Sequence, residues 1–216
     1  MRLDLRLIVL TDRELAAPRP VEDIVAACLA AGAPAIQLRD KNATARALLE
    51  QATRLLRLTR RHRALLFLND RLDVALAAGA DGVHLGPADL PITAARRAAP
   101  PPFLIGYSTD DPAEARRAAA AGADYIGCGA VFGTTTKDVG GERIGLERLA
   151  QVVRAVDIPV IGIGGIGPEN AAETRRTGAA GVAVIRAVMG AQDPGKAVRE
   201  LLAAFAGTSG GQARVG

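Results

Sequence analysis

Short apolar segments alternate with longer amphipathic segments along most of the chain. Eight apolar segments have the length and composition of strands buried on both faces, and they lie near residues 5–11, 35–40, 64–70, 82–86, 103–108, 125–131, 159–165 and 181–187. The segments between them have helical spacing, most clearly over 21–31, 43–60, 112–121, 145–155 and 194–205. This alternation predicts parallel strands joined by right-handed helical crossovers.

A small-residue motif stands between a helical segment and the next strand at four places: Ala31-Gly32-Ala33, Ala78-Gly79-Ala80, Ala121-Gly122-Ala123 and Thr177-Gly178-Ala179. Its glycine suits the left-handed conformation that ends a helix. Pro20, Pro112 and Pro168 suit the first turn of a helix, with Asp111 as a cap before Pro112. We therefore predict an α/β fold, a single (β/α)8 TIM barrel over residues 1–206 with a flexible tail at 207–216. An open, doubly wound sheet is the alternative.

The composition of the chain argues against several classes of protein. No apolar run approaches the roughly 18 residues of a membrane span, which argues against a membrane protein. The net charge is +4, the arginines are spread along the helices and only 3% of residues are aromatic, so a nucleic-acid surface is not indicated. Cys28 and Cys128 lack metal-ligand spacing and are predicted to be buried free thiols, which favours a reducing, cytoplasmic setting. The basic excess suits a small anionic substrate.

Polar residues gather where the predicted strands end, and an α/β barrel carries its active site at that end. In strand order they are Gln37, Arg39, Lys41, Asn69, Asp70, Asp89, Ser108, Thr134, Thr136, Lys137, Gly165 and Arg186, with Ile185 beside the last. The opposite strand ends carry small apolar residues such as Ala33 and Ala123.

Three of these groups point to an anion. Gln37, Arg39 and Lys41 would project from one face of a strand. Only 3 of the 27 basic residues are lysines, and Lys41 and Lys137 both lie in strand-end loops, where an ammonium can act as a point charge on phosphate. The loop 134–137 combines hydroxyls with an ammonium, although a solvated loop is the alternative.

Two further features suit a diphosphate substrate. Asp70 and Asp89 follow adjacent strands and could share one Mg²⁺, which takes one or two carboxylates plus phosphate oxygens; alternatively Asp70 pairs with Arg71 or caps a helix. The turn 164–167 could hold phosphate through its backbone N–H groups, or it could simply be a tight turn.

His84, in mid-strand, is predicted to be a core histidine with satisfied hydrogen bonds rather than a catalyst.

Several motifs occur together in order over about residues 7–205: Gln37-Leu-Arg-Asp-Lys41, Leu68-Asn-Asp-Arg71, Gly79-Ala-Asp-Gly-Val-His-Leu-Gly86 with Asp89, Ile105-Gly-Tyr-Ser-Thr109, Gly122-Ala-Asp-Tyr-Ile-Gly127, Val131-Phe-Gly-Thr-Thr-Thr-Lys137, Ile163-Gly-Gly-Ile166 with Glu169-Asn170, and Gly181-Val-Ala-Val184. In these motifs the chain resembles the thiamine-phosphate synthase family. The resemblance implies a barrel enzyme, a transferase, that joins hydroxymethylpyrimidine diphosphate to thiazole phosphate and releases pyrophosphate. The pyrimidine diphosphate would ionise, and the thiazole nitrogen would capture the cation.

The resemblance also implies roles for the strand-end residues. Gln37 would contact the pyrimidine, and Ser108 would lie near the reacting centre. The diphosphate would be held by Arg39, Lys41, Asn69 and Lys137, the Mg²⁺ by Asp70 and Asp89, and the thiazole phosphate by Thr134, Thr136, Gly165 and Ile185. Three positions depart from the family pattern. Pro87 replaces a frequent Gln, with little bearing on the mechanism, and Asp110 replaces a frequent His. Arg186 replaces a usual Ser and is kept as a candidate phosphate ligand.

Two other functions stay open: a thiazole tautomerase with the same barrel, and a non-catalytic barrel that binds phosphate. The intact set of Arg39, Lys41, Asp70, Asp89 and Lys137 favours the synthase. The expected partners are small molecules, with no nucleic acid and no membrane, and a homo-oligomer is compatible with the sequence.

Overall fold

The computed structural model describes residues 3–133 and 143–207, and within them eight parallel strands form a closed barrel. The strands are β1 (Leu7–Leu10), β2 (Ala35–Leu38), β3 (Leu65–Asn69), β4 (Gly82–Leu85), β5 (Leu104–Ser108), β6 (Tyr125–Cys128), β7 (Val160–Ile163) and β8 (Gly181–Val184). Each strand pairs with the next in the sequence, and β8 closes on β1, with Ile8 opposite both Ala35 and Ala183. Closure confirms the barrel and excludes the open sheet.

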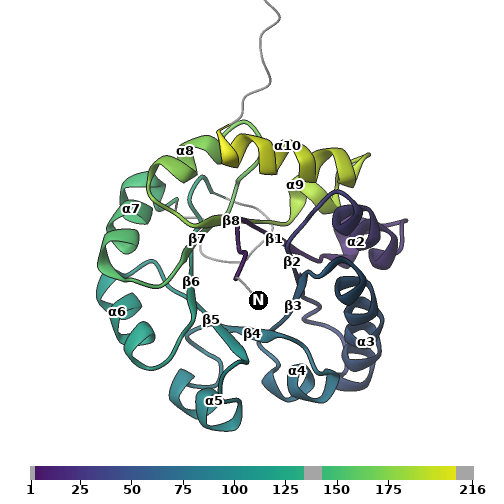
Figure 1. Cartoon of the computed structure of the whole chain (residues 1–216), viewed down its shortest axis with the longest axis horizontal. Coiled ribbons are helices and arrows are strands. Elements are labelled where there is room, and N and C mark those ends of the chain that lie inside the picture. The colour runs from purple at the N-terminus through teal and green to yellow at the C-terminus, as the bar shows by residue number, and fades with distance from the viewer. Residues whose placement is uncertain (1–2, 134–142, 208–216) are drawn as a thin grey trace, which may run out of the picture.

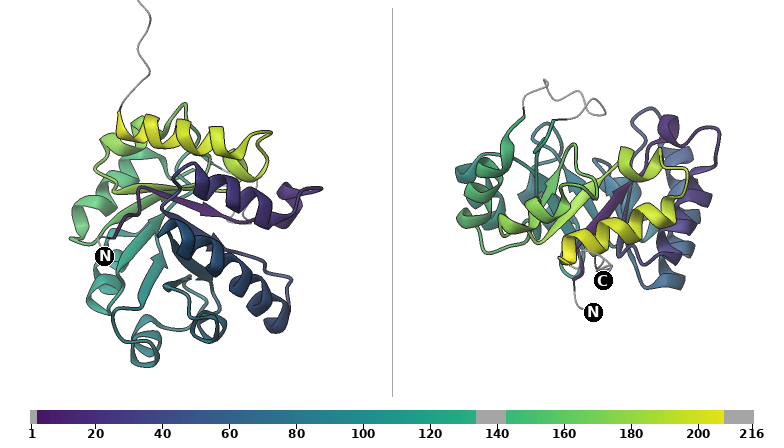
Figure 2. Two further views of the ribbon diagram at one scale, coloured as in Figure 1. Left: turned by 45° about the vertical axis from the view of Figure 1, so that its right-hand side comes forward. Right: turned by 90° about the horizontal axis from the view of Figure 1, so that it is seen from above.

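The helices form a ring around the barrel (Figures 1 and 2). They are α1 (Arg13–Ala16), α2 (Val21–Ala30), α3 (Ala45–His62), α4 (Leu72–Ala78), α5 (Ile92–Ala98), α6 (Pro112–Ala120), α7 (Gly145–Ala155), α8 (Ala171–Arg176), α9 (Arg186–Met189) and α10 (Pro194–Ala206). Strands with side chains buried on both faces, such as β1 and β8, are apolar throughout because the helices cover the outside and neighbouring strands fill the inside.

The predicted helix ends are largely confirmed. The glycines of the four small-residue motifs all have positive φ, between 70° and 103°, as a left-handed helix end requires. At the start of α6, Asp111 Oδ1 accepts a hydrogen bond from the Glu114 N–H at 2.6 Å, with Pro112 in the first turn. Pro168 departs from prediction, because it lies in a turn and α8 begins only at Ala171.

The predicted strands are too long at their carboxyl ends. The strand expected over 181–187 ends at Val184, and Arg186 begins the short helix α9, in which the Met189 N–H donates to the Ile185 carbonyl at 2.9 Å. The strand expected over 159–165 ends at Ile163, because Gly164 and Gly165 have φ of 98° and 65°. Apolar residues continue past these ends because the turns are also buried. A prediction from hydrophobicity alone therefore places the end of the strand too late.

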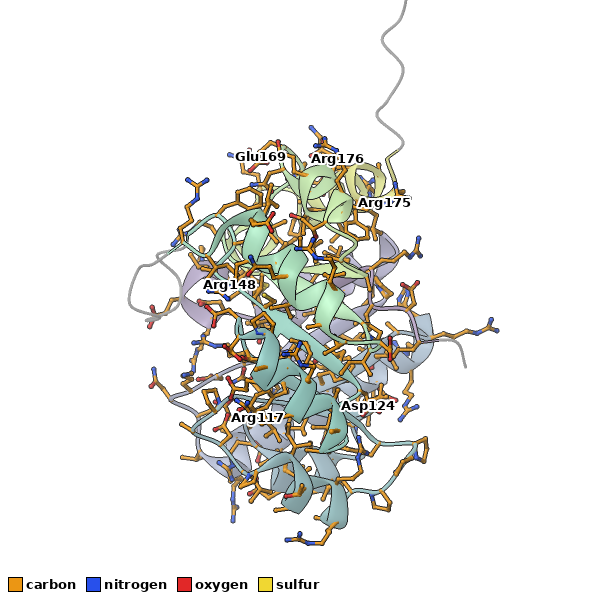
Figure 3. All side chains as sticks on the ribbon, turned by 90° about the vertical axis from the view of Figure 1, so that its left-hand side faces the viewer. Arg117, Asp124, Arg148, Glu169, Arg175 and Arg176 are labelled. Carbon is orange, nitrogen blue, oxygen red and sulfur yellow. The ribbon has the colours of Figure 1, made fainter. Side chains whose placement is uncertain are left out.

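Two aspartates have the same role at the strand starts. Asp81 precedes β4 and accepts a hydrogen bond from the Leu66 N–H at 2.8 Å; Asp124 precedes β6 and accepts one from the Ile105 N–H at 2.7 Å. The Arg96 guanidinium lies 2.5 Å from Asp124. Figure 3 shows Asp124 and Arg148 toward opposite ends of the barrel. Each aspartate therefore ties its own strand to the one before it, at the end away from the strand-end polar residues.

Cys28 on α2 and Cys128 on β6 are buried and free, as predicted. Burial raises the pKa of each thiol to about 12. Across the described ranges, no helix is both long enough and apolar enough to span a bilayer.

Candidate active site

A chain of hydrogen bonds lies inside the barrel near the carboxyl ends of β4, β5 and β6. His84 Nδ1 is 3.0 Å from the Tyr125 hydroxyl, and His84 Nε2 is 2.8 Å from Ser108 Oγ. Room for these side chains comes from Gly106, where a Cβ atom would overlap the Tyr125 ring. His84 is 8% exposed and both of its ring nitrogens are bonded. This confirms the prediction that His84 is a core histidine with satisfied hydrogen bonds. One of its two partners, however, is the candidate site residue Ser108.

Gln37 lies on β2 and lines the same small interior cavity as His84, Ser108 and Tyr125. The side chain is 3% exposed, and its Oε1 makes no hydrogen bond within the described parts of the chain. A buried polar atom without a partner costs about 1–3 kcal/mol. An unpaired amide oxygen facing a cavity is therefore suited to accept a hydrogen bond from a ligand.

Asp70 and Asp89 come together at the ends of β3 and β4, as predicted. Asp70 has φ of 64° and its N–H donates to the His84 carbonyl at 2.9 Å, while Asp89 Oδ2 accepts from the Gly86 N–H at 2.7 Å. The pKa of Asp70 is raised to about 6, chiefly by burial and then by the charge and hydrogen bond of Asp89. Neither alternative for Asp70 is favoured: Arg71 pairs with Asp73 at 2.6 Å, and the N-cap position of α4 is Arg71, with no side-chain cap hydrogen bond.

Arg39 and Lys41 lie close enough to this acidic pair for their charges to lower the pKa of Asp70 and partly oppose the effect of burial. The end of β2 is fixed by buried Thr11, whose hydroxyl accepts from the Arg39 N–H at 2.9 Å and donates to the Arg39 carbonyl at 3.2 Å. Arg39 is half-buried and Lys41 exposed. The structure thus brings two cations and two carboxylates to one edge of the barrel's open end, where the carboxyl ends of the strands meet; this end is called the mouth below.

The acidic pair fits a divalent cation by its chemistry. Two carboxyl groups that share a hydrogen bond need a proton or a cation between them, and Mg²⁺ commonly takes two carboxylates with further ligands from water or phosphate. Clusters of three or more His, Cys, Asp or Glu side chains able to hold a metal are absent from residues 3–133 and 143–207. An ion held here would therefore need oxygen ligands from outside the carboxylate pair.

A larger cavity of about 610 Å³ opens beside Ser108, at the ends of β5 to β7. It is lined by backbone at Gly127, Gly129 and Gly164 and by charged side chains of Asp110, Glu114, Arg143 and Arg148. Glu114 hydrogen-bonds both Tyr107 and Thr109, the two neighbours of Ser108. This cavity is the wider part of the mouth.

The turns after β7 and β8 carry the other described candidates. Asn170 closes the first turn: its Oδ1 accepts from the Gly167 N–H, and its Nδ2 donates to the Gly165 carbonyl, both at 2.9 Å. Gly165 is exposed at this turn, Ile185 is buried at the start of α9, and Arg186 is exposed beside it. In α/β barrels these two turns frequently form a phosphate site.

The remaining candidates have different outcomes. Asn69 is the last residue of β3 and lies opposite His84 in the strand register. Thr134, Thr136 and Lys137 lie outside the described residues. Sequence reasoning missed Glu114, because a glutamate in the first turn of a helix is normally explained by capping. Asn170 is part of one of the family motifs, but its role in closing the turn was not predicted.

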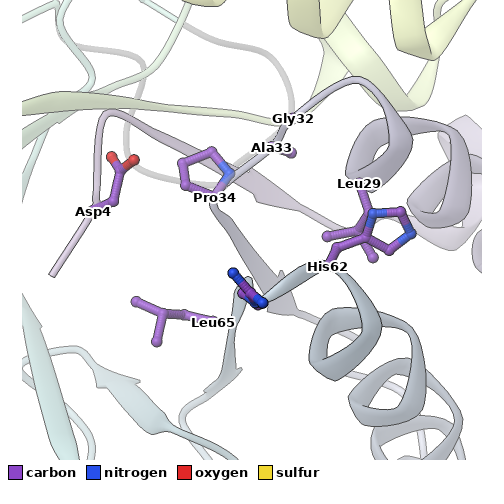
Figure 4. Close-up of a pocket in the computed structure, with 8 residues that line it drawn as sticks. Asp4, Leu29, Gly32, Ala33, Pro34, His62 and Leu65 are labelled. Atoms are coloured by element: carbon purple, nitrogen blue, oxygen red, sulfur yellow. The ribbon is translucent and has the colours of Figure 1, made fainter. Parts of the chain in front are cut away.

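A third cavity, of about 220 Å³, lies at the opposite end of the barrel, where α2 and α3 lead into β2 and β3 (Figure 4). Leu29, Pro34, His62 and Leu65 are among its lining residues. None of the strand-end polar residues borders it, so the strand-end mouth remains the candidate site.

Residues 7–188 match the model of a family described as thiamine monophosphate synthase. Over 180 residues the chain is 53% identical to the thiamine biosynthesis bifunctional protein ThiM/ThiE of Symbiobacterium thermophilum, covering 83% of this chain but only 38% of that longer protein. Over 208 residues it is 49% identical to the thiamine-phosphate synthase of Roseiflexus sp. (strain RS-1), covering 96% of this chain and 88% of the relative. The solved structure of a thiamine phosphate pyrophosphorylase from Pyrococcus furiosus is 47% identical and superposes with a TM-score of 0.87, covering 96% of this chain and 98% of that one.

Proposed function

Because this chain belongs to the thiamine monophosphate synthase family, we propose that it joins hydroxymethylpyrimidine diphosphate to thiazole phosphate, giving thiamine monophosphate and pyrophosphate. The observation that carries the proposal is the convergence of Arg39 and Lys41 on the Asp70–Asp89 pair. Two cations beside a metal-binding pair of carboxylates suit a diphosphate better than a single phosphate ester.

The reaction begins when the carbon–oxygen bond between the pyrimidine methylene and the diphosphate breaks. The electron pair leaves with pyrophosphate, and the methylene becomes a cation stabilised by the pyrimidine ring. The thiazole nitrogen then donates its lone pair to form the new carbon–nitrogen bond. No proton has to be removed for either bond change, which agrees with a His84 whose ring nitrogens are already hydrogen-bonded.

The diphosphate gains negative charge as it leaves, so groups that bind it more strongly in the transition state accelerate the reaction. A cation at about 4 Å contributes about 4 kcal/mol at an effective dielectric of about 20, before desolvation. Arg39 and Lys41 would supply two such contacts, with Asn69 as a hydrogen-bond donor beside them. Lys137 would add a third cation from outside the described residues.

Asp70 and Asp89 would hold Mg²⁺. When bound, the ion supplies positive charge that neutralises the phosphate oxygens. Two charged carboxylates this close would repel each other, so a bound cation would allow both to stay ionised.

The pyrimidine would enter the interior cavity beside Gln37, whose unpaired Oε1 can accept a hydrogen bond from the ring's amino group. Ser108 would lie at the reacting centre. The thiazole phosphate would bind at the turns after β7 and β8, at Gly165, Ile185 and Arg186, with Thr134 and Thr136 completing the set.

The test is incubation of the purified protein with both precursors and Mg²⁺, with pyrophosphate and thiamine monophosphate as the measured products. Stoichiometric formation of both products is expected. Isomerisation of the thiazole without pyrophosphate would instead make the protein a tautomerase. Phosphate binding without either reaction would make it a non-catalytic barrel.

We further propose a cytoplasmic setting, supported by the two free buried cysteines. The partners are the two small-molecule substrates, and a homo-oligomer is compatible with this assignment. Sedimentation of the purified protein would measure the assembly state.

A further inference from the structure

Glu114 links the first turn of α6 to the end of β5. Its Oε1 accepts a hydrogen bond from the Tyr107 hydroxyl at 2.9 Å, and its Oε2 accepts one from the Thr109 hydroxyl at 2.7 Å. Both carboxylate oxygens are therefore bonded to side chains of the preceding strand end. Hydrogen bonds to a charged carboxylate are about twice as strong as those between neutral groups.

The two bonded residues flank Ser108 on either side. Side chains alternate along a strand, so Tyr107 and Thr109 leave the face opposite to that of Ser108. Ser108 Oγ lies 2.8 Å from His84 Nε2 inside the barrel. Glu114 thus holds the strand end from the helix side while Ser108 faces the interior.

The start of α6 is capped without the Glu114 side chain. Asp111 Oδ1 accepts from the Glu114 N–H at 2.6 Å, and the Asp111 N–H donates to the Thr109 hydroxyl at 3.1 Å. In a usual capping box the glutamate would bond the cap residue's own N–H; here Thr109 takes that N–H. The Glu114 carboxylate therefore takes no part in capping α6, and both of its oxygens bond residues at the end of β5.

The donors are in the state that these bonds require. Burial and the nearby Glu114 carboxylate raise the pKa of Tyr107 to about 12, so the phenol keeps its proton at neutral pH. The Thr109 hydroxyl donates to Glu114 and accepts from Asp111, while the Thr109 N–H donates to the Gly127 carbonyl at 3.1 Å. Thr109 is therefore held by three partners, of which Glu114 and Asp111 belong to α6 and its cap and Gly127 belongs to β6.

We propose that Glu114 is a positioning residue: acting through Tyr107 and Thr109, it fixes the end of β5 so that Ser108 stays directed at His84 and the reacting centre. This inference rests on the proposed function for its effect on turnover. It predicts a loss in the chemical step rather than in substrate affinity, because both carboxylate oxygens of Glu114 are bonded to Tyr107 and Thr109.

The first experiment compares Glu114→Ala with Glu173→Ala in steady-state pyrophosphate release. Glu173 is a matched control, since it is also the third residue of its helix, and its carboxylate makes no hydrogen bond to any residue the structure describes. Glu114→Ala should lower kcat by about tenfold or more with KM for both substrates changed less than about threefold. Glu173→Ala should change kcat less than twofold. Equal effects of the two substitutions would overturn the proposal.

A double-mutant cycle tests whether Glu114 acts through Ser108. Ser108→Ala should lower kcat on its own, and adding Glu114→Ala should lower it by less than about threefold more, because the group being positioned is already gone. Losses that multiply in full would show that Glu114 acts independently of Ser108 and would overturn the proposal. If Glu114→Ala does not fold, the pair Tyr107→Phe with Thr109→Val removes the same two bonds and takes its place.

A readout without substrate separates this inference from the proposed function. The chain has only two histidines, His62 and His84, so their ring ¹⁵N resonances can be assigned and compared. Glu114→Ala should shift the His84 Nε2 resonance and leave those of exposed His62 unchanged. If wild type releases no pyrophosphate, the proposed function fails, and this resonance alone decides whether Glu114 orients Ser108. An unchanged His84 resonance would overturn the inference even in an active enzyme.

Discussion

The Asp89 carboxyl lies close enough to Asp70 to raise its pKa by charge and by side-chain hydrogen bonding, although the two residues follow different strands. The left-handed backbone at Asp70 turns the chain at the end of β3, and the bond from the Gly86 N–H orients Asp89 after β4. Burial and this shared contact raise the pKa of Asp70 to about 6. If the pair holds Mg²⁺ as proposed, a proton and the cation would compete for it.

Mg²⁺ binding should weaken in acid. Below pH about 6 the cation must displace a proton from Asp70, so its apparent affinity should fall by up to about tenfold per pH unit. Thermal unfolding with and without Mg²⁺, in the absence of substrate, measures this at pH 5 and pH 7.5 without interference from substrate titration. A stabilisation by Mg²⁺ that is equal at both pH values would contradict the assignment of the pair.

Asp70→Asn should stabilise the protein at neutral pH when Mg²⁺ is absent. The pKa of Asp70 is higher in the folded chain than its ordinary value of 3.8, so its contribution is present below that value and is lost as pH rises through about 6. After allowance for solvent screening of a half-buried group, we expect about 1 kcal/mol at pH 7.5 and no difference at pH 3. Urea unfolding at the two pH values measures it, and the same variant should lose the Mg²⁺ response.

Gln37→Leu should separate stability from activity. Replacing the amide by an apolar side chain of similar size removes the unpaired Oε1, a buried acceptor that costs about 1–3 kcal/mol, and it also removes the hydrogen bond of this side chain to Tyr125. The melting temperature should stay equal or rise, while KM for the pyrimidine diphosphate should rise about tenfold or more through loss of the Oε1 acceptor. Retained affinity in a stable variant would remove Gln37 from the pyrimidine site. Gln51→Leu, on α3, serves as a control for the change of composition.

Asp124→Ala should destabilise the barrel without altering the site. It removes the acceptor of the Ile105 N–H and of the largely buried Arg96 guanidinium, and we expect a loss of about 2–3 kcal/mol. Asp81→Ala should cost less, because its partner Arg60 is 59% exposed and 3.5 Å away. Urea unfolding gives the energies, and unchanged KM values in the folded variants check that the mouth is unaffected.

The barrel was predictable because each strand has a clear apolar segment and each of four helices ends in the same small-residue motif. The proximity of Asp70 to Asp89 followed from the same logic, since adjacent parallel strands end at one edge. The start of α9 at Arg186 was not predictable, because the apolar run continues through the buried turn. The sequence shows where an apolar run stops, but it does not show where strand hydrogen bonds give way to the hydrogen bonds of a helix.

The finer connections of the site depend on tertiary contacts. His84 was predicted to be a satisfied core residue, and only the register of β4 against β5 shows that Ser108 is one of its partners. Glu114 has the sequence position of a capping residue, and its actual contacts depend on how α6 packs against the end of β5. Local pattern identifies the residue types at the mouth, whereas packing decides which of them bond to one another.

Backbone pairing between β6 and β7 continues beyond the strands themselves. The Val131 N–H donates to the Ile163 carbonyl at 2.9 Å and the Phe132 N–H to the Gly164 carbonyl at 3.0 Å, while a Cβ atom at Gly165 would overlap the Gly133 carbonyl. Which amino acid is tolerated at position 165 is thus dictated by the main chain of a segment far earlier in the sequence. Any substitution or insertion that reshapes one of these two turns should require a compensating change in the other.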